Sequence, residues 1–246
     1  MILLYLFASL LIILLLYALL LGICALFVDS KKEYKTHSPF YRWLLNGATA
    51  LGLRFARVEV SVTGMEKIPT DTRVLFVGNH RSKFDPIITW YIFRAWEPAF
   101  LSKKENFHVP VFGRLIRKCC FMAIDRENPR KALETINKAA DLMTKDQVSI
   151  GVYPEGTRGK NSELLPFHNG VLKIAQKAKA PVAVIAIDGT ERIAKNYPRC
   201  KTKVYLDVVD VIPTEEVCAV QSRELGERIR YQLEEKLKNR KDVENK

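Results

Sequence analysis

Residues 74–96 read VLFVGNHRSKFDPIITWYIFRAW, and this stretch decides the fold class. It opens on a short apolar run at 74–78, continues through a polar loop, and ends in a proline-led segment of helical character at 86–96. A strand that is apolar on both faces is typical of a parallel sheet covered by helices. We therefore predict a strand, a loop and a helix, with the loop at the carboxyl end of a buried strand.

The same alternation of strand-like and helix-like segments runs through the rest of the chain. Besides 74–78, short β-branched or aromatic runs predict strands at 58–62, 121–124, 148–153, 182–187 and 204–211. Helices are expected at 86–96, 129–145, 170–179 and about 215–239. This order predicts an α/β domain over residues 57–246, with a largely parallel central sheet flanked by helices.

The N-terminal segment differs sharply from this body. Residues 1–28 carry no charged side chain, although the chain of 246 residues has a formal net charge of +12. A helix of this length, rising about 1.5 Å per residue, can cross a hydrocarbon core of about 30 Å. A cleaved signal peptide is the alternative, but it would need a basic start and a shorter apolar run. We expect a retained transmembrane or membrane-inserted anchor.

The residues behind the anchor predict its orientation and a second membrane contact. Lys31, Lys32 and Lys35 follow immediately and place the body on the cytoplasmic side of the cell membrane. Residues 29–56 then form a juxtamembrane segment that includes a weaker apolar helix at 41–55. Two interpretations of this helix stay open: a packing helix of the core, or an interfacial helix with Trp43 at headgroup level.

The composition excludes several classes of protein. Hydrophobic residues make up 48% and aromatic residues 10%, which excludes intrinsic disorder. No second uncharged run of spanning length exists, which excludes a multi-span transporter. The five cysteines are an odd number without C-x-x-C spacing, so we expect neither a disulfide framework nor a zinc site.

The loop after the strand at 74–78 contains His80 and Asp85. One interpretation is that Asp85 caps the next helix and Pro86 occupies its first turn. The other is a His–Asp pair, because a bent loop can fold the carboxylate onto one ring nitrogen and leave the other as a general base. No G-x-S-x-G sequence supplies a nucleophilic serine. Such a base therefore indicates a substrate that brings its own hydroxyl.

The loop after 148–153 reads PEGTRGK at 154–160. A Pro/Gly turn followed by solvated charges is the plain interpretation. A turn rich in backbone N–H groups, with Thr157, Arg158 and Lys160 beside it, also suits an anion. It is not a Walker loop, since Thr157-Arg158 stands where Lys-Ser/Thr is required. Arg126 directly follows another predicted strand and adds a cation that the function could use.

Four blocks in this order resemble the glycerolipid acyltransferase family, and within it the bacterial 1-acyl-sn-glycerol-3-phosphate (lysophosphatidic acid) acyltransferases. They cover about residues 74–190: NHRSKFDP at 79–86, the basic stretch 103–126 ending in IDR, YPEGTR at 153–158, and 180–190 from Ala-Pro-Val to Gly-Thr. Two positions depart from the family pattern. Tyr153 stands where the family more often has Phe, and Cys120 stands where it often has Gly.

The resemblance implies an α/β acyltransferase, a reaction and a set of site residues. The reaction would transfer an acyl chain from acyl-CoA or acyl carrier protein to the free hydroxyl of 1-acylglycerol-3-phosphate, forming phosphatidic acid without an acyl-enzyme. No metal, and no cofactor beyond the acyl-donor substrate, is implied. The implied residues are the catalytic His80 and Asp85, the phosphate-binding Lys103, Arg126 and Arg158, and the pocket-forming Glu155, Gly156 and Thr157.

Two other functions stay open at this point. The acceptor could be a different lysolipid, which an acceptor panel would reveal. Alternatively, the positive body could be a non-catalytic, membrane-tethered domain that binds anionic lipid or nucleic acid. No nucleic-acid motif is present, and a mere binder has no need of His80 and Asp85 together, so we expect membrane lipids rather than nucleic acid as partners.

Overall fold

A computed structural model describes residues 1–159 and 163–244. Its centre is a seven-stranded sheet whose strands lie in the order β1-β7-β6-β2-β5-β3-β4. Every neighbouring pair is parallel except β6 and β7. The strands are β1 (Val58–Thr63), β2 (Leu75–Gly78), β3 (Pro98–Ser102), β4 (Met122–Ala123), β5 (Ser149–Val152), β6 (Val182–Asp188) and β7 (Thr202–Ile212). The predicted α/β fold with a largely parallel sheet is confirmed.

Strand β2 occupies the position that matters most for the site. Leu75 pairs with Ile150 of β5 on one side and with Val182 of β6 on the other. All four residues of β2 are buried. Because β5, β2 and β6 are parallel, their carboxyl ends meet at one edge of the sheet, which is where ligands of open α/β sheets bind.

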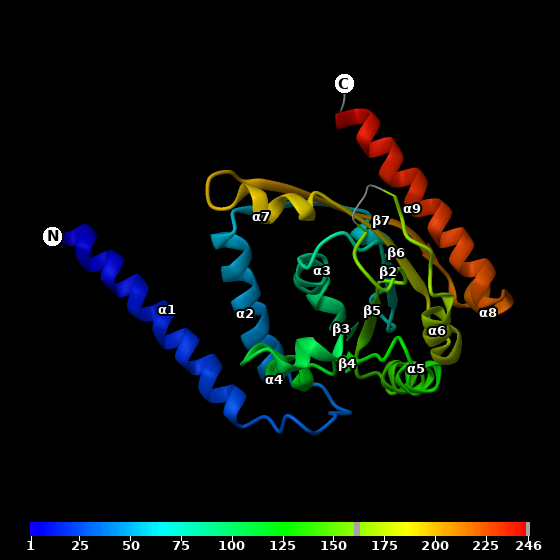
Figure 1. The fold of residues 1–246 in the computed structure, drawn as a ribbon, viewed down its shortest axis with the longest axis horizontal. Coiled ribbons are helices and arrows are strands. Elements are labelled where there is room, and N and C mark those ends of the chain that lie inside the picture. The colour runs from blue at the N-terminus through cyan, green and yellow to red at the C-terminus, as the bar shows by residue number, and fades with distance from the viewer. Residues whose placement is uncertain (160–162, 245–246) are drawn as a thin grey trace.

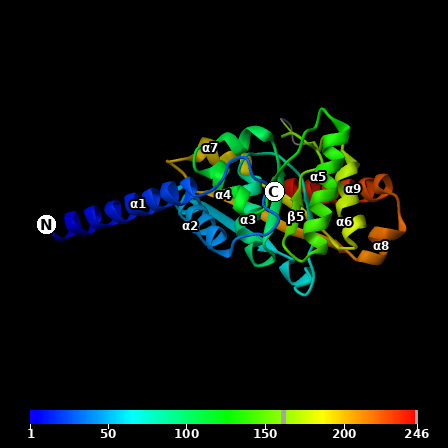
Figure 2. The same ribbon diagram turned by 90° about the horizontal axis from the view of Figure 1, so that it is seen from below.

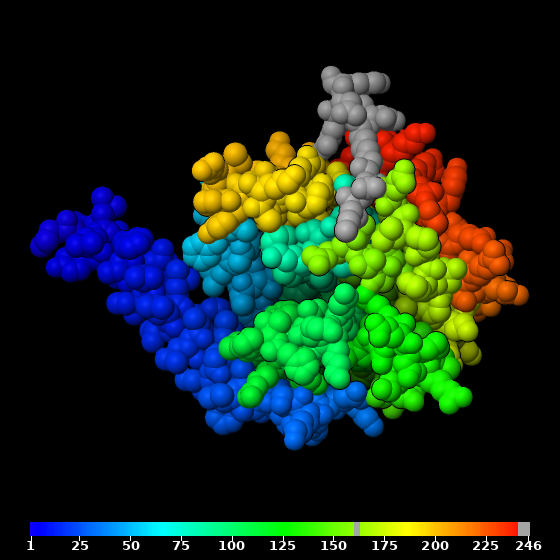
Figure 3. Space-filling view, in the orientation of Figure 1, coloured from blue at the N-terminus to red at the C-terminus, as the bar shows by residue number. Residues whose placement is uncertain are grey.

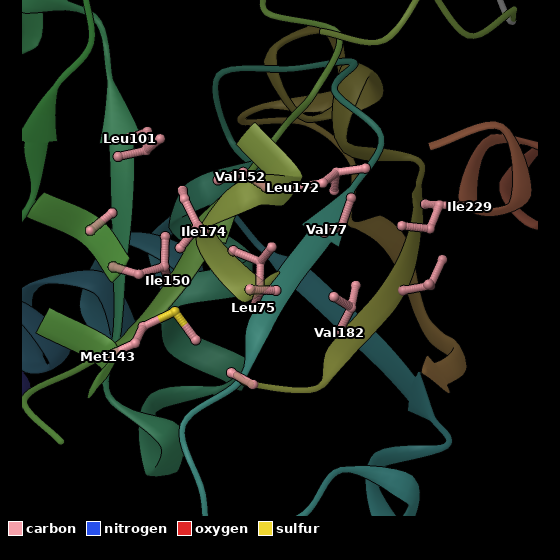
Figure 4. Close-up of a cluster of buried hydrophobic side chains, with 14 of the residues drawn as sticks. Leu75, Val77, Leu101, Met143, Ile150, Val152, Leu172, Ile174, Val182 and Ile229 are labelled. Carbon is pink, nitrogen blue, oxygen red and sulfur yellow. The ribbon is translucent and has the colours of Figure 1, made fainter. Parts of the chain in front are cut away.

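Helices cover both faces of the sheet (Figure 1). On one face α5 (Pro129–Thr144), α6 (Lys173–Ala178) and α9 (Ser222–Glu244) enclose a core (Figure 4) that includes Leu75, Ile150 and Val182 from the strands. On the other face α3 (Asp85–Ile92) and α7 (Ile193–Asn196) enclose a second core around Phe76. These two layers hold the central strands rigidly, because protein cores are packed as densely as organic crystals.

The two N-terminal helices behave differently from each other. α1 (Ile2–Leu26) extends away from the body (Figures 1 and 2) and, among the described residues, is the one helix long and apolar enough to cross a membrane. α2 (Pro39–Phe55) packs on the body through Leu44, which is fully buried, while it exposes Phe40 and Trp43. The Tyr17 hydroxyl of α1 donates to the Leu44 carbonyl at 2.6 Å, which ties the two helices together.

Several boundaries differ from the sequence-based predictions. β3 was not predicted because it begins with Pro98, although proline is tolerated as the first residue of a strand. The short α4 (Phe112–Lys118) was not predicted either. The helix predicted at 215–239 is two helices, α8 (Thr214–Ala219) and α9, because Val220 between them is extended with ψ 161°. Buried Cys120 adopts φ 63°, a left-handed conformation that glycine prefers.

Short 3-10 segments complete the chain. They are η1 (Met65–Lys67), η2 (Arg94–Trp96), η3 (Lys104–His108), η4 (Asn169–Leu172) and η5 (Thr190–Arg192). The segment predicted as one helix at 170–179 is η4 followed by α6. The turn η5 lies directly behind β6 and so belongs to the same sheet edge as the loops after β2 and β5.

Candidate active site

The loop after β2 is fastened to the neighbouring strand before it reaches His80. The Asn79 side chain, which is fully buried, donates to the Ile187 carbonyl at 2.9 Å and accepts from the Ile187 N–H at 2.8 Å. The amide thus continues the pairing of β2 with β6 for one more residue, where the strand itself has ended. This fixes the direction in which the loop leaves the sheet.

His80 and Asp85 form a hydrogen-bonded pair. Nδ1 of His80 lies 2.8 Å from Oδ2 of Asp85, and the same oxygen accepts from the backbone N–H groups of Arg81 and Ser82 at 2.7 Å each. The other oxygen, Oδ1, accepts from the hydroxyl of Thr190 in η5. The two backbone N–H groups and the Thr190 hydroxyl all donate to Asp85, so the fully buried carboxylate is held as an acceptor for a proton on His80 Nδ1.

A second contact, on the face of the ring, also orients His80. The ring stacks on Tyr153 with ring centroids 4.6 Å apart and an interplanar angle of 23°. The Tyr153 hydroxyl donates to Thr89 Oγ1 at 3.0 Å. Burial, helped by the negative charge of Asp85, raises the pKa of Tyr153 well above its ordinary value, so the phenol stays neutral. Tyr153 therefore orients the imidazole without adding charge.

Glu155 connects the loops after β2 and β5. Its Oε1 accepts from the His80 N–H at 2.6 Å and its Oε2 accepts from the Leu165 N–H at 2.9 Å. Only 3% of the residue is exposed, and this burial raises the pKa of its carboxyl. Glu155 does not line the cavity described next, so it can shape the site only through the backbone that it holds.

A cavity of about 1080 Å³ opens beside His80. It lies on the face of Figure 3, where the surface is hollowed between the segment of α3 and those of α4 and α5. Besides His80, its lining includes Lys103, Arg126, Gly156, Thr157 and Arg158. The structure thus brings together at one cavity the predicted base and most of the residues that the sequence predicts for phosphate binding. Asp85 and Glu155 stand behind its wall, and Lys160 lies outside the described residues.

The cations of this cavity are available to a ligand. Lys103, Arg126 and Arg158 are exposed. Within the part of the chain that the structure describes, none of them makes an ion pair with a carboxylate. Burial lowers the pKa of Arg126 from its ordinary value, yet a guanidinium remains charged at neutral pH. A phosphate would therefore meet positive charge that no protein carboxylate has neutralised.

The remainder of the cavity wall is largely apolar. Leu45 of α2, Trp90 of α3 and Ile116 of α4 line it, together with Phe121 and with Leu133 of α5. Leu45, Trp90, Ile116 and Phe121 pack in one cluster, so this part of the wall suits a hydrocarbon chain, while the part with the cations suits a charged headgroup. Such a division matches an amphiphilic ligand.

Three side chains of the site were not predicted from the sequence. Thr190 supports Asp85, and Arg81 donates to Asp188 at the end of β6 with a distance of 2.7 Å between Nη1 and Oδ1. His168 lines the cavity. The sequence signals are weak: tight turns follow β5 and β6, but their partners lie far away along the chain. Among the residues that the structure describes, no group of three or more His, Cys, Asp or Glu side chains is arranged to hold a metal ion.

Comparison with known proteins gives a consistent set of similarities. The family described as Acyltransferase matches residues 59–188, which is more than half of the chain. The 1-acyl-sn-glycerol-3-phosphate acyltransferase of Cocos nucifera is 35% identical over 122 residues, covering 49% of this chain and 39% of that protein. The protein of the same name from Haemophilus influenzae is 29% identical over 150 residues, covering 59% and 62%. The match thus spans less than two thirds of the length of either relative.

A longer match and a solved structure extend the comparison. The 1-acyl-sn-glycerol-3-phosphate acyltransferase of Borreliella burgdorferi is 27% identical over 196 residues, covering 79% of this chain and 78% of that protein. The crystal structure of the 1-acyl-sn-glycerophosphate (LPA) acyltransferase PlsC from Thermotoga maritima superimposes with a TM-score of 0.69 at 22% identity. It covers 92% of this chain and 89% of that one, so the fold is shared over nearly the whole length.

Proposed function

Because this chain belongs to the acyltransferase family, we propose that it transfers an acyl chain from an acyl thioester to the free hydroxyl of 1-acylglycerol-3-phosphate, forming phosphatidic acid for phospholipid biosynthesis. One observation carries the proposal. The His80–Asp85 pair opens onto a cavity with free cations at one end and apolar side chains at the other. A base, a phosphate site and a hydrocarbon site are the three things that this reaction needs.

The chemistry follows from the proton on His80 Nδ1. Asp85 holds it there, so Nε2 is the basic nitrogen and takes the proton of the acceptor hydroxyl as its oxygen attacks the thioester carbonyl. Asp85 stabilises the imidazolium that results. When the tetrahedral intermediate collapses, the C–S bond breaks and Nε2 returns its proton to the leaving thiolate. The ester is the product and the free thiol leaves, so no acyl-enzyme and no further cofactor are needed.

Substrate placement follows from the two ends of the cavity. Lys103, Arg126 and Arg158 hold the acceptor's phosphate, since guanidinium groups can contact phosphate oxygens in pairs. Gly156 and Thr157 border this end, and Glu155 fixes the loop behind it. The acyl chains occupy the apolar end, which α2, α3, α4 and α5 enclose.

The membrane is the source of the acceptor and receives the product. α1 anchors the protein, and Phe40 and Trp43 of α2 lie at the headgroup level. The lysines that follow α1 keep the catalytic body on the cytoplasmic side. Acyl-CoA or acyl carrier protein then delivers the thioester from that side.

The test is acyl transfer by purified protein in lipid vesicles. Wild type should convert 1-acylglycerol-3-phosphate and an acyl thioester to phosphatidic acid, and a panel with both donors identifies the one it uses. His80→Ala should lower kcat about 10²- to 10⁴-fold, the usual contribution of a general base. His108→Ala is the matched control, because His108 is exposed in η3 and does not line the cavity. Full activity of His80→Ala would refute the mechanism, and transfer only to another lysolipid would refute the acceptor.

A further inference from the structure

A second imidazole stands at the phosphate end of the cavity, across the loop from His80. A methyl group built on Gly156 would lie 2.9 Å from Cδ2 and 3.2 Å from Nε2 of His168. The same methyl group would lie 3.9 Å from Cδ of Arg126. His168 and Arg126 therefore flank one glycine, and the missing side chain of Gly156 is what lets them approach. The φ of 68° at this residue also favours glycine.

The backbone of His168 is fixed in this place. Its N–H donates to the Pro154 carbonyl at 2.8 Å, and the nearby Leu165 N–H donates to Glu155 at 2.9 Å. Glu155 also accepts from the backbone of His80. One short loop thus positions both histidines. A ligand phosphate held beside Gly156 would stand at a set distance from the reactive base.

The ring of His168 is free to bind. It is exposed to the cavity, and within residues 1–159 and 163–244 no side chain or backbone group makes a hydrogen bond or ion pair with it. Apart from the two histidines, the charged residues that line the cavity are all cations: Lys83, Lys103, Arg126, Arg158 and Lys173. An imidazole among cations has no protein acceptor to satisfy it, but it can donate to an anion.

We propose that His168 selects a phosphate monoester as the headgroup of the acceptor, a refinement that rests on the function proposed above. A monoester has three terminal oxygens. The Arg126 guanidinium can engage two of them, and the N–H of His168 donates to the third across Gly156. A diester headgroup has only two terminal oxygens and carries a substituent where the third would be. His168 thereby favours 1-acylglycerol-3-phosphate over lysolipids whose phosphate bears an alcohol.

The test compares acceptors that differ only in the headgroup. His168→Ala should raise the KM for 1-acylglycerol-3-phosphate roughly 10- to 100-fold, the range expected for one hydrogen bond to a charged group. Its kcat should stay within about twofold, and the KM for 1-acylglycerol-3-phosphocholine, a diester that lacks the third terminal oxygen, should not change. His168→Lys should restore most of the affinity, because it supplies a donor and a positive charge. An unchanged KM in His168→Ala, or equal losses with both acceptors, would overturn the proposal.

A binding measurement separates this proposal from the proposed function. Calorimetric titration of wild type, His168→Ala and His108→Ala with glycerol 3-phosphate requires no acyl transfer. We expect weaker binding only for His168→Ala, by a similar factor of roughly 10 to 100. If His168→Ala weakens the binding of glycerol 3-phosphate but wild type acylates no acceptor, the proposed function is wrong and the phosphate site at His168 is supported. If wild type acylates the acceptor but the variant binds equally well, the role of His168 is wrong and the function stands. Thermal melting of His168→Ala beside wild type shows whether a loss reflects unfolding.

Discussion

Replacing Thr190 by Val tests how the His–Asp pair is held. Thr190 donates its hydroxyl to Oδ1 of Asp85, and both residues are fully buried. Valine keeps the branched shape but has no hydroxyl, so one oxygen of a buried carboxylate loses its donor. Because neither side chain is exposed, bulk water does not supply a replacement donor.

The expected size of the effect comes from the charge of the acceptor. A hydrogen bond to a charged group is worth about 1.5–3 kcal/mol, and a factor of ten in rate corresponds to about 1.4 kcal/mol. Asp85 keeps its three contacts through Oδ2, so the pair should form but should be oriented less well. We expect kcat to fall about 10- to 100-fold. KM for the acceptor should change little, because Thr190 does not line the cavity.

The assay is steady-state acyl transfer in vesicles, with Thr190→Ser as the matched control. Serine keeps the hydroxyl and loses only the methyl group, so its kcat should stay within about threefold of wild type. Equal losses in both variants would show that packing, and not the hydrogen bond, explains the effect. A Thr190→Val enzyme with unchanged kcat would refute the idea that η5 supports catalysis through Asp85.

Three further predictions address the loop and the anchor. Burial raises the Glu155 pKa above its ordinary value of 4.5, so ionising this carboxyl in the folded protein costs stability. The free energy of unfolding of wild type should therefore fall as the pH rises from 4.5 through the raised pKa. Glu155→Gln should lack this dependence in thermal melts from about pH 4 to 7. Gly156→Ala should raise the acceptor KM at least tenfold, since the added methyl meets His168 at 2.9 Å in a left-handed backbone. Gly52→Ala should not, because nothing lies within 4 Å of its added methyl and Gly52 does not line the cavity. Deleting residues 1–16 leaves too little of α1 to span a bilayer, which takes about 20 residues, so the protein should be released by a carbonate wash while its melting temperature stays close to that of wild type.

Local patterns predicted much of the fold. The apolar runs at 74–78, 148–153 and 182–187 are the three central strands β2, β5 and β6, because buried parallel strands need apolar side chains on both faces. The sequence predicts a ligand site at their polar ends, and the cavity beside His80 opens there. β3 was not predicted because it begins with a proline, a residue that is unfavourable inside a strand.

The support of the site could not be predicted in the same way. Thr190 meets Asp85 across 105 residues of sequence, and Glu155 meets the His80 backbone across 75. Such contacts depend on the order of the strands in the sheet, and no local sequence pattern predicts that order. His168 shows the same limit, since its place over Gly156 depends on a chain reversal that only the structure reveals.

The site has a buried, rigid part and an exposed, adaptable part, and this division predicts which variants change kcat and which change the acceptor KM. Asn79, Asp85, Glu155 and Thr190 are buried, and each fastens the loop after β2 to another segment. The phosphate-end cations are exposed side chains with no carboxylate partner in the described residues. Long exposed side chains can adjust to the position of a headgroup, whereas the proposed base, His80, must already be placed when the proposed lipid acceptor binds. Changes in the buried set should therefore lower kcat, and changes in the exposed set should raise the acceptor KM, which steady-state kinetics on one variant from each set can distinguish.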